Sequence, residues 1–142
     1  ELGYNYRMSN VVAGIGRGQL KVLDQRIAKK KYIFEFYKRE LNGLEGIKFM
    51  PINDWNEPNY WLTCITLNGK VRPIDIIEAL ERENIESRPI WKPMHMQPVF
   101  ASYDFISKGV SEKIFENGVC LPSDTKMTDD DLERVCSIIK NL

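Results

Sequence analysis

The sequence has few residues of the kinds that build a metal site or a disulfide framework. It contains three cysteines, Cys64, Cys120 and Cys136, and a single histidine, His95. The cysteines are far apart in the sequence and form no CxxC pair, which argues against a disulfide framework and against structural zinc, whose ligands come in close pairs. We therefore expect free thiols in a reducing cytoplasm and no metal.

Charge of one sign and long apolar runs are lacking as well. Lys and Arg together number 20 and Asp and Glu together number 20, so the net charge is zero and gives no general reason to expect a nucleic-acid or membrane binder. The apolar runs are short, whereas a membrane-spanning helix needs about 20 residues. The N-terminus resembles neither a natural start nor a signal peptide, and we expect the chain to be cut from a longer one.

What is present suits one globular domain: 142 residues, 43% of them hydrophobic and 28% charged. From Ser9 to Leu44, apolar residues recur every three or four positions, which predicts one long bent amphipathic helix or two stacked helices. Ser9 is a good N-cap and Gly43 a good residue to follow the helix end. A break is expected near Leu23, after which Asp24 caps a second helix.

The rest of the chain predicts a mixture of short strands and helices. The predicted elements are strands over 47–52, 60–67 and 85–90, helices over 73–83, 111–117 and 128–139, and a brief extended piece over 119–122. Three prolines predict a loop of fixed path over 88–98, because proline lacks the donor that a helix needs. The order of elements predicts an α+β fold with one small three-stranded sheet covered by helices.

Several local patterns allow two interpretations. Gly14, Gly16 and Gly18 do not have the spacing of a dinucleotide-binding loop, and we interpret them as allowing close packing of a helix against a neighbour. The stretch 17–40 has eight basic and three acidic residues with aromatics between them. This composition is typical of a nucleic-acid-binding helix but more often of the solvated face of an amphipathic one.

Two polar features also have alternative interpretations. The acidic run Asp129-Asp130-Asp131 is better explained as the charged start of a helix than as a metal site, because successive helical side chains point about 100° apart. His95 has the chemistry of an acid–base group. No carboxylate close in the chain orients it, and on that ground alone we expect a solvated loop histidine.

Three segments, in order, resemble the DegT/DnrJ/EryC1/StrS family of pyridoxal-phosphate-dependent sugar aminotransferases, which have fold type I. The first is Gly3-Tyr4-Asn5-Tyr6-Arg7-Met8-Ser9-Asn10 followed by Ala13, Gly16, Gln19 and Leu20. The second is the proline-rich stretch Arg88-Pro89-Ile90-Trp91-Lys92-Pro93-Met94-His95-Met96-Gln97-Pro98-Val99-Phe100. The third is Gly118-Val119-Cys120-Leu121-Pro122-Ser123 with Asp131, Leu132 and Val135. Gly14 and Gly18 depart from the pattern, because family members more often carry alanine there.

The resemblance implies the C-terminal small domain of a fold-type-I enzyme, with a small, mainly antiparallel sheet covered by helices and a long N-terminal helical segment. Residues 1–44 would be the helical segment linking to a missing large domain, and residues 45–142 the α+β C-terminal domain. The implied reaction moves an amino group from glutamate to a nucleotide-linked keto sugar, for cell-surface polysaccharide, glycan or antibiotic sugar biosynthesis. In the family the Schiff-base lysine and the phosphate cup lie upstream, so we expect no catalytic residue in this segment and no activity from it alone.

The resemblance also implies roles for five residues in a homodimer. Asn5 would reach the cofactor phosphate of the neighbouring subunit, and Arg7 would support the same anionic surroundings. His95, Lys92 and Arg88 would lie near the sugar nucleotide, the two cations as partners for its diphosphate. Two other classes stay open: a non-catalytic oligomerisation module, and a regulatory or nucleic-acid-binding domain that uses the basic helix 17–40.

Overall fold

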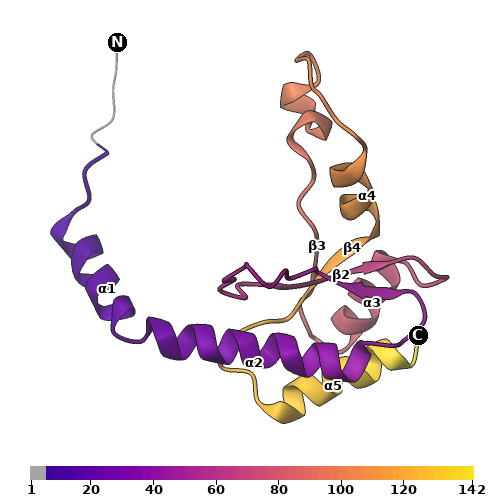
Figure 1. The fold of residues 1–142 in the computed structure, drawn as a ribbon, viewed down its shortest axis with the longest axis horizontal. Coiled ribbons are helices and arrows are strands. Elements are labelled where there is room, and N and C mark those ends of the chain that lie inside the picture. Colours follow the sequence, from indigo (N-terminus) through magenta and orange to yellow (C-terminus); the bar gives the residue numbers. More distant parts are fainter. Residues whose placement is uncertain (1–5) are drawn as a thin grey trace.

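The computed structural model of the chain describes residues 6–142 (Figure 1). Its strands form a four-stranded antiparallel sheet in the order β1-β2-β4-β3. The elements are α1 (Asn10–Leu20), α2 (Leu23–Leu41), β1 (Ile47–Phe49), β2 (Thr63–Leu67), α3 (Pro73–Arg82), β3 (Arg88–Pro89), the 3-10 turns η1 (Met94–Met96) and η2 (Pro98–Phe100), α4 (Val110–Asn117), β4 (Gly118–Leu121) and α5 (Asp129–Lys140). The predicted α+β class, with a small antiparallel sheet covered by helices and a long N-terminal helical segment, is confirmed.

The core lies between one face of the sheet and the helices α2, α3 and α5. Side chains alternate between the two faces of a strand, and on β2 the core side is occupied by Ile65 and Leu67. The helices bring apolar side chains to the same cluster, among them Tyr37 and Leu41 from α2 and Leu132 from α5. The opposite face of β2 and β4 carries Cys64 and Cys120 and lies on the side of α4, whose Phe115 lines a hollow there together with Cys120.

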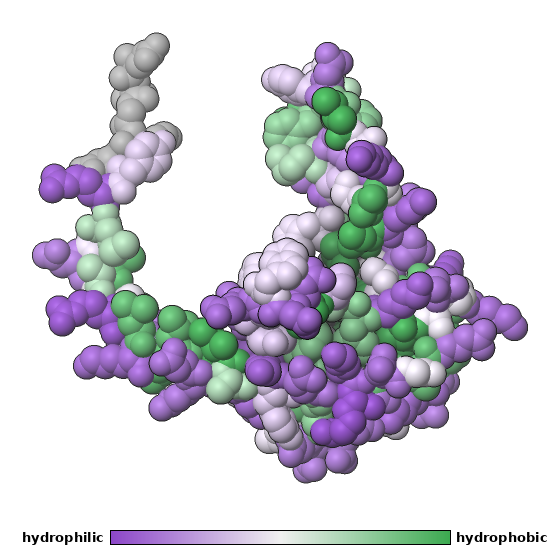
Figure 2. Space-filling model, in the orientation of Figure 1, coloured by the Kyte–Doolittle hydropathy of each residue, from purple (hydrophilic) through white to green (hydrophobic). Residues whose placement is uncertain are grey.

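The N-terminal limb, residues 6–22, extends away from the sheet (Figure 1). The Ser9 hydroxyl accepts a hydrogen bond from the Val12 amide at 3.3 Å, which confirms the predicted N-cap. No residue of α1 is buried, and its apolar side chains Val11, Val12 and Ile15 are more than half exposed. Figure 2 shows this hydrophobic surface in green along the limb. No atom of another described element would come within 4 Å of a Cβ at the three helical glycines, so residues 6–142 do not supply the predicted close packing.

The break between the first two helices is confirmed, but the predicted cap is wrong. The amides of Lys21 and Val22 bond back to the carbonyls of Gly18 and Gln19, which closes a turn between the helices. The second helix therefore begins at Leu23, with Val22 as N-cap and no capping side-chain bond. Asp24 lies inside the first turn, where its charge still complements the helix dipole.

The sheet differs from the predicted three strands in four places. The predicted strand 47–52 ends at Phe49, shortly before Pro51, which cannot donate to a strand ladder. The segment 119–122, predicted as an extended piece, contributes β4, which pairs with both β2 and β3. The predicted strand 60–67 begins only at Thr63, because Tyr60 has a positive φ of 54° and the Trp61 amide bonds to the Asn59 side chain. The predicted strand 85–90 shrinks to Arg88 and Pro89, as expected at a sheet edge where proline cannot donate.

Candidate functional site

Two groups of polar and aromatic side chains stand out on the α4 side of the sheet. One lies on the arm, which comprises residues 91–117 and projects from the sheet through η1, η2 and α4 (Figure 1). The other lines a hollow at the base of the arm. Together they contain three of the five residues predicted as site residues.

On the arm, the His95 side chain contacts a carboxylate that lies 17 positions later in the same arm. His95 lies in η1 and Glu112 in the first turn of α4, with Nε2 and Oε1 2.9 Å apart. The imidazole also stacks on the ring of Phe105, at a centroid distance of 4.3 Å and an interplanar angle of 15°. The side chains of His95 and Glu112 are only 17% and 23% exposed. The expectation of a solvated, unoriented histidine is therefore wrong.

Glu112 is itself held in place by two serines. Its Oε1 accepts from the Ser107 hydroxyl at 2.6 Å and its Oε2 accepts from the Ser111 hydroxyl at 2.9 Å. The Ser107 bond is the largest of several that lower the pKa of Glu112 to about 2. An ionised carboxylate only accepts, so the imidazole presents an N–H from Nε2 to Glu112, and Nδ1 points elsewhere. We call His95, Phe105, Ser107, Ser111 and Glu112 the His95 cluster.

The hollow, with a volume of about 530 Å³, lies over the strand face opposite the core. The indoles of Trp61 and Trp91 form one side of it, with ring centroids 5.7 Å apart and an interplanar angle of 38°. Arg88 and Lys92 also line it, and Arg88 Nε donates to Glu86 Oε1 at 2.7 Å. An apolar hollow with two cations has the composition of a site for an anionic ligand that carries an aromatic or other apolar part.

The rim of the hollow is fixed by bonds from α2. The Lys30 ammonium donates to the backbone carbonyls of Trp61, at 3.0 Å, and of Ser123. The Tyr37 hydroxyl donates to the carbonyl of Pro122 at 2.8 Å. Burial lowers the pKa of Lys30, and the nearby Asp124 opposes that shift. The backbone that carries Trp61 and Pro122 is thus attached to the core helix rather than free to move.

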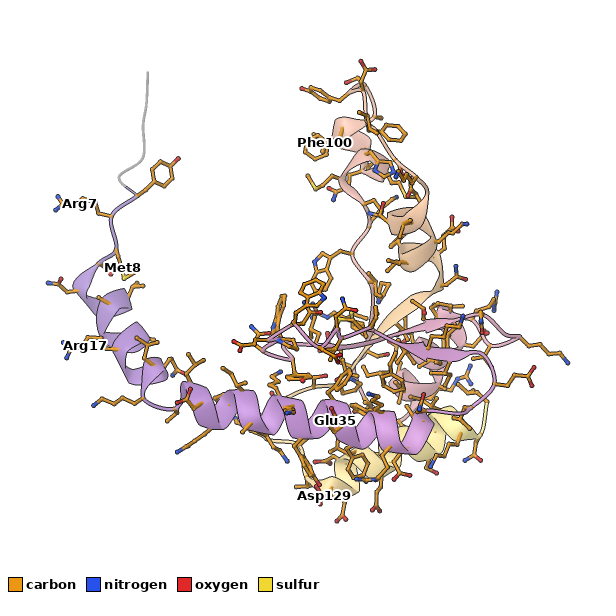
Figure 3. All side chains as sticks on the ribbon, viewed as in Figure 1. Arg7, Met8, Arg17, Glu35, Phe100 and Asp129 are labelled. Atoms are coloured by element: carbon orange, nitrogen blue, oxygen red, sulfur yellow. The ribbon has the colours of Figure 1, made fainter. Side chains whose placement is uncertain are left out.

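The structure brings together some of the predicted site residues and separates others. Arg88 and Lys92 line the same hollow, whose lining does not include His95. Arg7 is exposed on the N-terminal limb, and Figure 3 shows it across the molecule from Phe100, which lies in the arm. Asn5 lies outside the described residues. The five predicted residues therefore do not form one pocket within residues 6–142.

Sequence reasoning missed the partners of His95. Nothing near His95 in the sequence indicates Glu112, 17 positions away. The one available signal was the predicted helix over 111–117, which places Glu112 in a first turn where an acid is favoured. The contact depends on how the arm folds back at Gly109, whose φ of 73° suits glycine.

No group of three or more His, Cys, Asp or Glu side chains in residues 6–142 is arranged to hold a metal ion. None of the helices described is both long enough and apolar enough to cross a bilayer.

Comparison with known proteins identifies relatives over nearly the whole chain. EpsN of Bacillus subtilis (strain 168), whose name describes a pyridoxal phosphate-dependent aminotransferase, is 45% identical over 146 residues that cover 100% of this chain and 38% of EpsN. GDP-perosamine synthase of Vibrio cholerae is 35% identical over 148 residues, which cover 99% of this chain and 39% of the synthase. The chain therefore spans well under half the length of these relatives.

The fold is also shared with solved structures. Helicobacter pylori PseC, an aminotransferase involved in the biosynthesis of pseudoaminic acid, matches 99% of this chain with a TM-score of 0.86 at 16% identity, over 39% of its own length. At that identity the likeness shows the fold alone. The family model of the DegT/DnrJ/EryC1/StrS aminotransferase family matches residues 1–140, and the chain belongs to this family.

Proposed function

We propose that the chain is part of a pyridoxal-phosphate-dependent enzyme that moves an amino group from glutamate to a nucleotide-linked keto sugar. The product would serve the biosynthesis of a cell-surface polysaccharide, a glycan or an antibiotic sugar, and the enzyme would act in the cytoplasm. The observation that carries the proposal is membership of a sugar aminotransferase family, with a GDP-perosamine synthase 35% identical over 99% of the chain. Because the chain covers 38% of EpsN and 39% of that synthase, the activity is proposed for a larger protein.

The described residues do not by themselves fit pyridoxal phosphate. The cofactor needs a lysine amine for its aldehyde, an acid for its ring nitrogen and donors for its phosphate, and when bound it supplies the electron sink of the reaction. The partly buried Lys30 uses its ammonium on two backbone carbonyls. Lys92 lies in the hollow, and its side chain is exposed. The acid there, Glu86, is already bonded to Arg88 and is not available for a ring nitrogen. We place the main cofactor site outside this chain.

Asn5 and Arg7 are proposed to reach the cofactor phosphate of a second subunit in a homodimer. Arg7 is exposed on a limb that extends away from the sheet, which is the geometry needed to reach another subunit (Figure 3). An asparagine amide donates a hydrogen bond to phosphate without adding a fixed charge. The exposed apolar side of α1, with Val11, Val12 and Ile15, provides surface for the same contact.

The nucleotide sugar is proposed to bind on the α4 side of the sheet. Arg88 and Lys92 would pair with its diphosphate, since both cations line one hollow beside two indoles. His95 would donate to or accept from the sugar nucleotide at the arm. Its ring is held on one edge by Glu112 and on one face by Phe105, so it would meet a ligand in a fixed orientation.

The alternative of a nucleic-acid-binding helix is not favoured by the structure. Of the four aromatic residues between the basic residues of 17–40, Phe34, Phe36 and Tyr37 are buried and not available to stack on bases. Tyr32 is 41% exposed, and its hydroxyl donates to Asp129. The lysines beside them instead lie on the exposed side of α2 or, for Lys30, hold the rim of the hollow. Salt-dependent binding to DNA is the measurement that would support that alternative.

The experiment that tests the proposal uses the complete enzyme with glutamate and a nucleotide-linked keto sugar. Lys92→Met is compared with Lys113→Met, which removes an exposed lysine on α4 that does not line the hollow. Loss of one charge-assisted bond to diphosphate should raise the KM for the sugar nucleotide about tenfold or more. The half-reaction with glutamate should be unchanged in both variants. Equal KM values in the two variants would contradict the assignment of Lys92, and absence of any amino transfer would contradict the proposed function.

A further inference from the structure

Two of the three cysteines face each other across the middle of the sheet. Cys64 on β2 and Cys120 on β4 are register partners, and their sulfur atoms are 3.6 Å apart. The two residues are 56 positions apart in the sequence, and neither thiol is in a disulfide. Facing residues of antiparallel strands have Cβ atoms about 4.5–5.5 Å apart, close to the roughly 3.5–4.5 Å of a disulfide. Joining the sulfurs therefore requires a small approach and side-chain rotation, not a rearrangement of the strands.

The pair is reachable from outside the core. Both side chains lie on the face of the sheet opposite the core cluster, and Cys120 lines the hollow beside Trp61 and Trp91. Cys64 is partly exposed. Cys136, by contrast, lies on α5 within the core cluster and is 2% exposed. A small oxidant that enters the hollow meets Cys120 of the facing pair and not the third cysteine.

We propose that Cys64 and Cys120 form an oxidation site, at which a peroxide joins the two sulfurs in a reversible disulfide between β2 and β4. In the first step the Cys120 thiol releases its proton and the thiolate attacks one peroxide oxygen. The O–O bond breaks and the leaving hydroxide takes up a proton, so that hydrogen peroxide gives one sulfenic acid and one water. In the second step the Cys64 sulfur attacks the Cys120 sulfur, the S–O bond of the sulfenic acid breaks, and its hydroxyl leaves as water with the proton from the Cys64 thiol. In total, two thiols and one hydrogen peroxide give one disulfide and two waters, and a dithiol reductant reverses the change.

Access from the hollow sets the order of these steps, because Cys120 lines the hollow and Cys64 is not among its lining residues. The hydrogen bond between the two sulfurs also lowers the pKa of Cys120, although burial acts in the opposite direction. The same bond, with burial, raises the pKa of Cys64. Since the thiolate is the nucleophile, Cys120 reacts first and Cys64 resolves the product. Free cytosolic cysteines that do pair are usually redox-sensing or catalytic, which suits a reversible bond.

The test is peptide mapping of the native enzyme after treatment with hydrogen peroxide and blocking of the remaining thiols. Trypsin places Cys64 in the peptide 49–70, Cys120 in 114–126 and Cys136 in 135–140. We expect 49–70 and 114–126 to appear as one linked species, lighter by two hydrogens than their sum and separated by dithiothreitol. The peptide 135–140 should stay reduced. The matched control Cys136→Ser should give the same linked species.

Cys64→Ser should abolish the linked species and leave Cys120 as a sulfenic acid that dimedone traps. Cys64→Val serves the same purpose should the serine variant fail to fold. Three outcomes would overturn the proposal: Cys120 oxidised to sulfinic acid with Cys64 still free in the native enzyme, Cys120 linked to a different cysteine, or both thiols unreacted after Cys136 has been modified. The proposal does not depend on the aminotransferase activity, so the mapping succeeds or fails independently of it.

Discussion

Replacing Tyr37 with phenylalanine isolates the bond that ties the rim of the hollow to the core helix. Tyr37 is 0% exposed, and its hydroxyl donates to the Pro122 carbonyl at 2.8 Å. Burial raises the pKa of Tyr37, so the hydroxyl remains a protonated donor throughout the working pH range. Phenylalanine keeps the ring in the core and opens no cavity, and the change in stability therefore reports the lost hydrogen bond.

The expected loss is about 1–2 kcal/mol of unfolding free energy, since one neutral bond disappears and the Pro122 carbonyl loses its donor in a partly buried position. In a domain of this size that corresponds to a Tm lower by about 3–6 °C. Urea unfolding at fixed protein concentration measures the effect, and the slope of free energy against urea should not change.

Tyr32→Phe is the matched control for Tyr37→Phe. The Tyr32 hydroxyl also donates at 2.8 Å, to Asp129, but the ring is 41% exposed and water can replace that bond. Its variant should unfold within experimental error of the parent chain. Equal and negligible losses in both variants would refute the reasoning, because they would show that the Pro122 carbonyl is hydrated and that Tyr37 does not hold the rim.

Three further predictions concern association, cofactor retention and pH. The 142-residue chain should self-associate at micromolar concentration through α1, and Val12→Asp should weaken this in sedimentation; a monomer of unchanged solubility in both forms would show that this apolar face needs no partner. In the complete enzyme, Asn5→Asp should weaken cofactor retention by about 1–3 kcal/mol, measured by dialysis and absorbance, and unchanged affinity would exclude a phosphate contact. Because the folded-state pKa of Glu112 lies at about 2, below its unfolded value, its stabilisation of the arm is complete above about pH 4.5 and is lost as pH falls toward 2. Hydrogen exchange of residues 91–117 should show that loss, and Glu112→Gln should remove the pH dependence in that interval.

The helices were predictable because their signals are local. At Thr128 the hydroxyl accepts from the Asp131 amide and the Asp131 carboxylate accepts from the Thr128 amide, a capping box contained in four consecutive residues. Ser9 and Pro73 mark helix starts in the same local way. The error at Asp24 is a shift of a helix start by a residue or two, which a side-chain preference cannot resolve.

The sheet and the sites depend on contacts between distant residues, which one sequence does not encode locally. The segment Gly118–Leu121 is buried along its whole length because it lies between two strands, so it shows no alternation that would indicate a central strand. Its register brings Cys120 opposite Cys64, and no spacing in the sequence suggests that pairing. The bond between His95 and Glu112 depends in the same way on the path of the arm. The family could be assigned from three motifs in the sequence. The roles of Asn5 and Arg7 follow from that resemblance and stay proposals.

The central claim is that the enzyme containing this chain moves nitrogen from glutamate to a nucleotide-linked keto sugar. Its most direct test is to incubate the complete enzyme and pyridoxal phosphate with glutamate labelled with heavy nitrogen and with nucleotide-linked keto sugars, and to analyse the sugar nucleotides by mass spectrometry. We predict a nucleotide-linked amino sugar that carries the label, formed together with an equal amount of 2-oxoglutarate. Label that stays in glutamate with every keto sugar tried, or that passes only to small 2-oxo acids, would contradict the account.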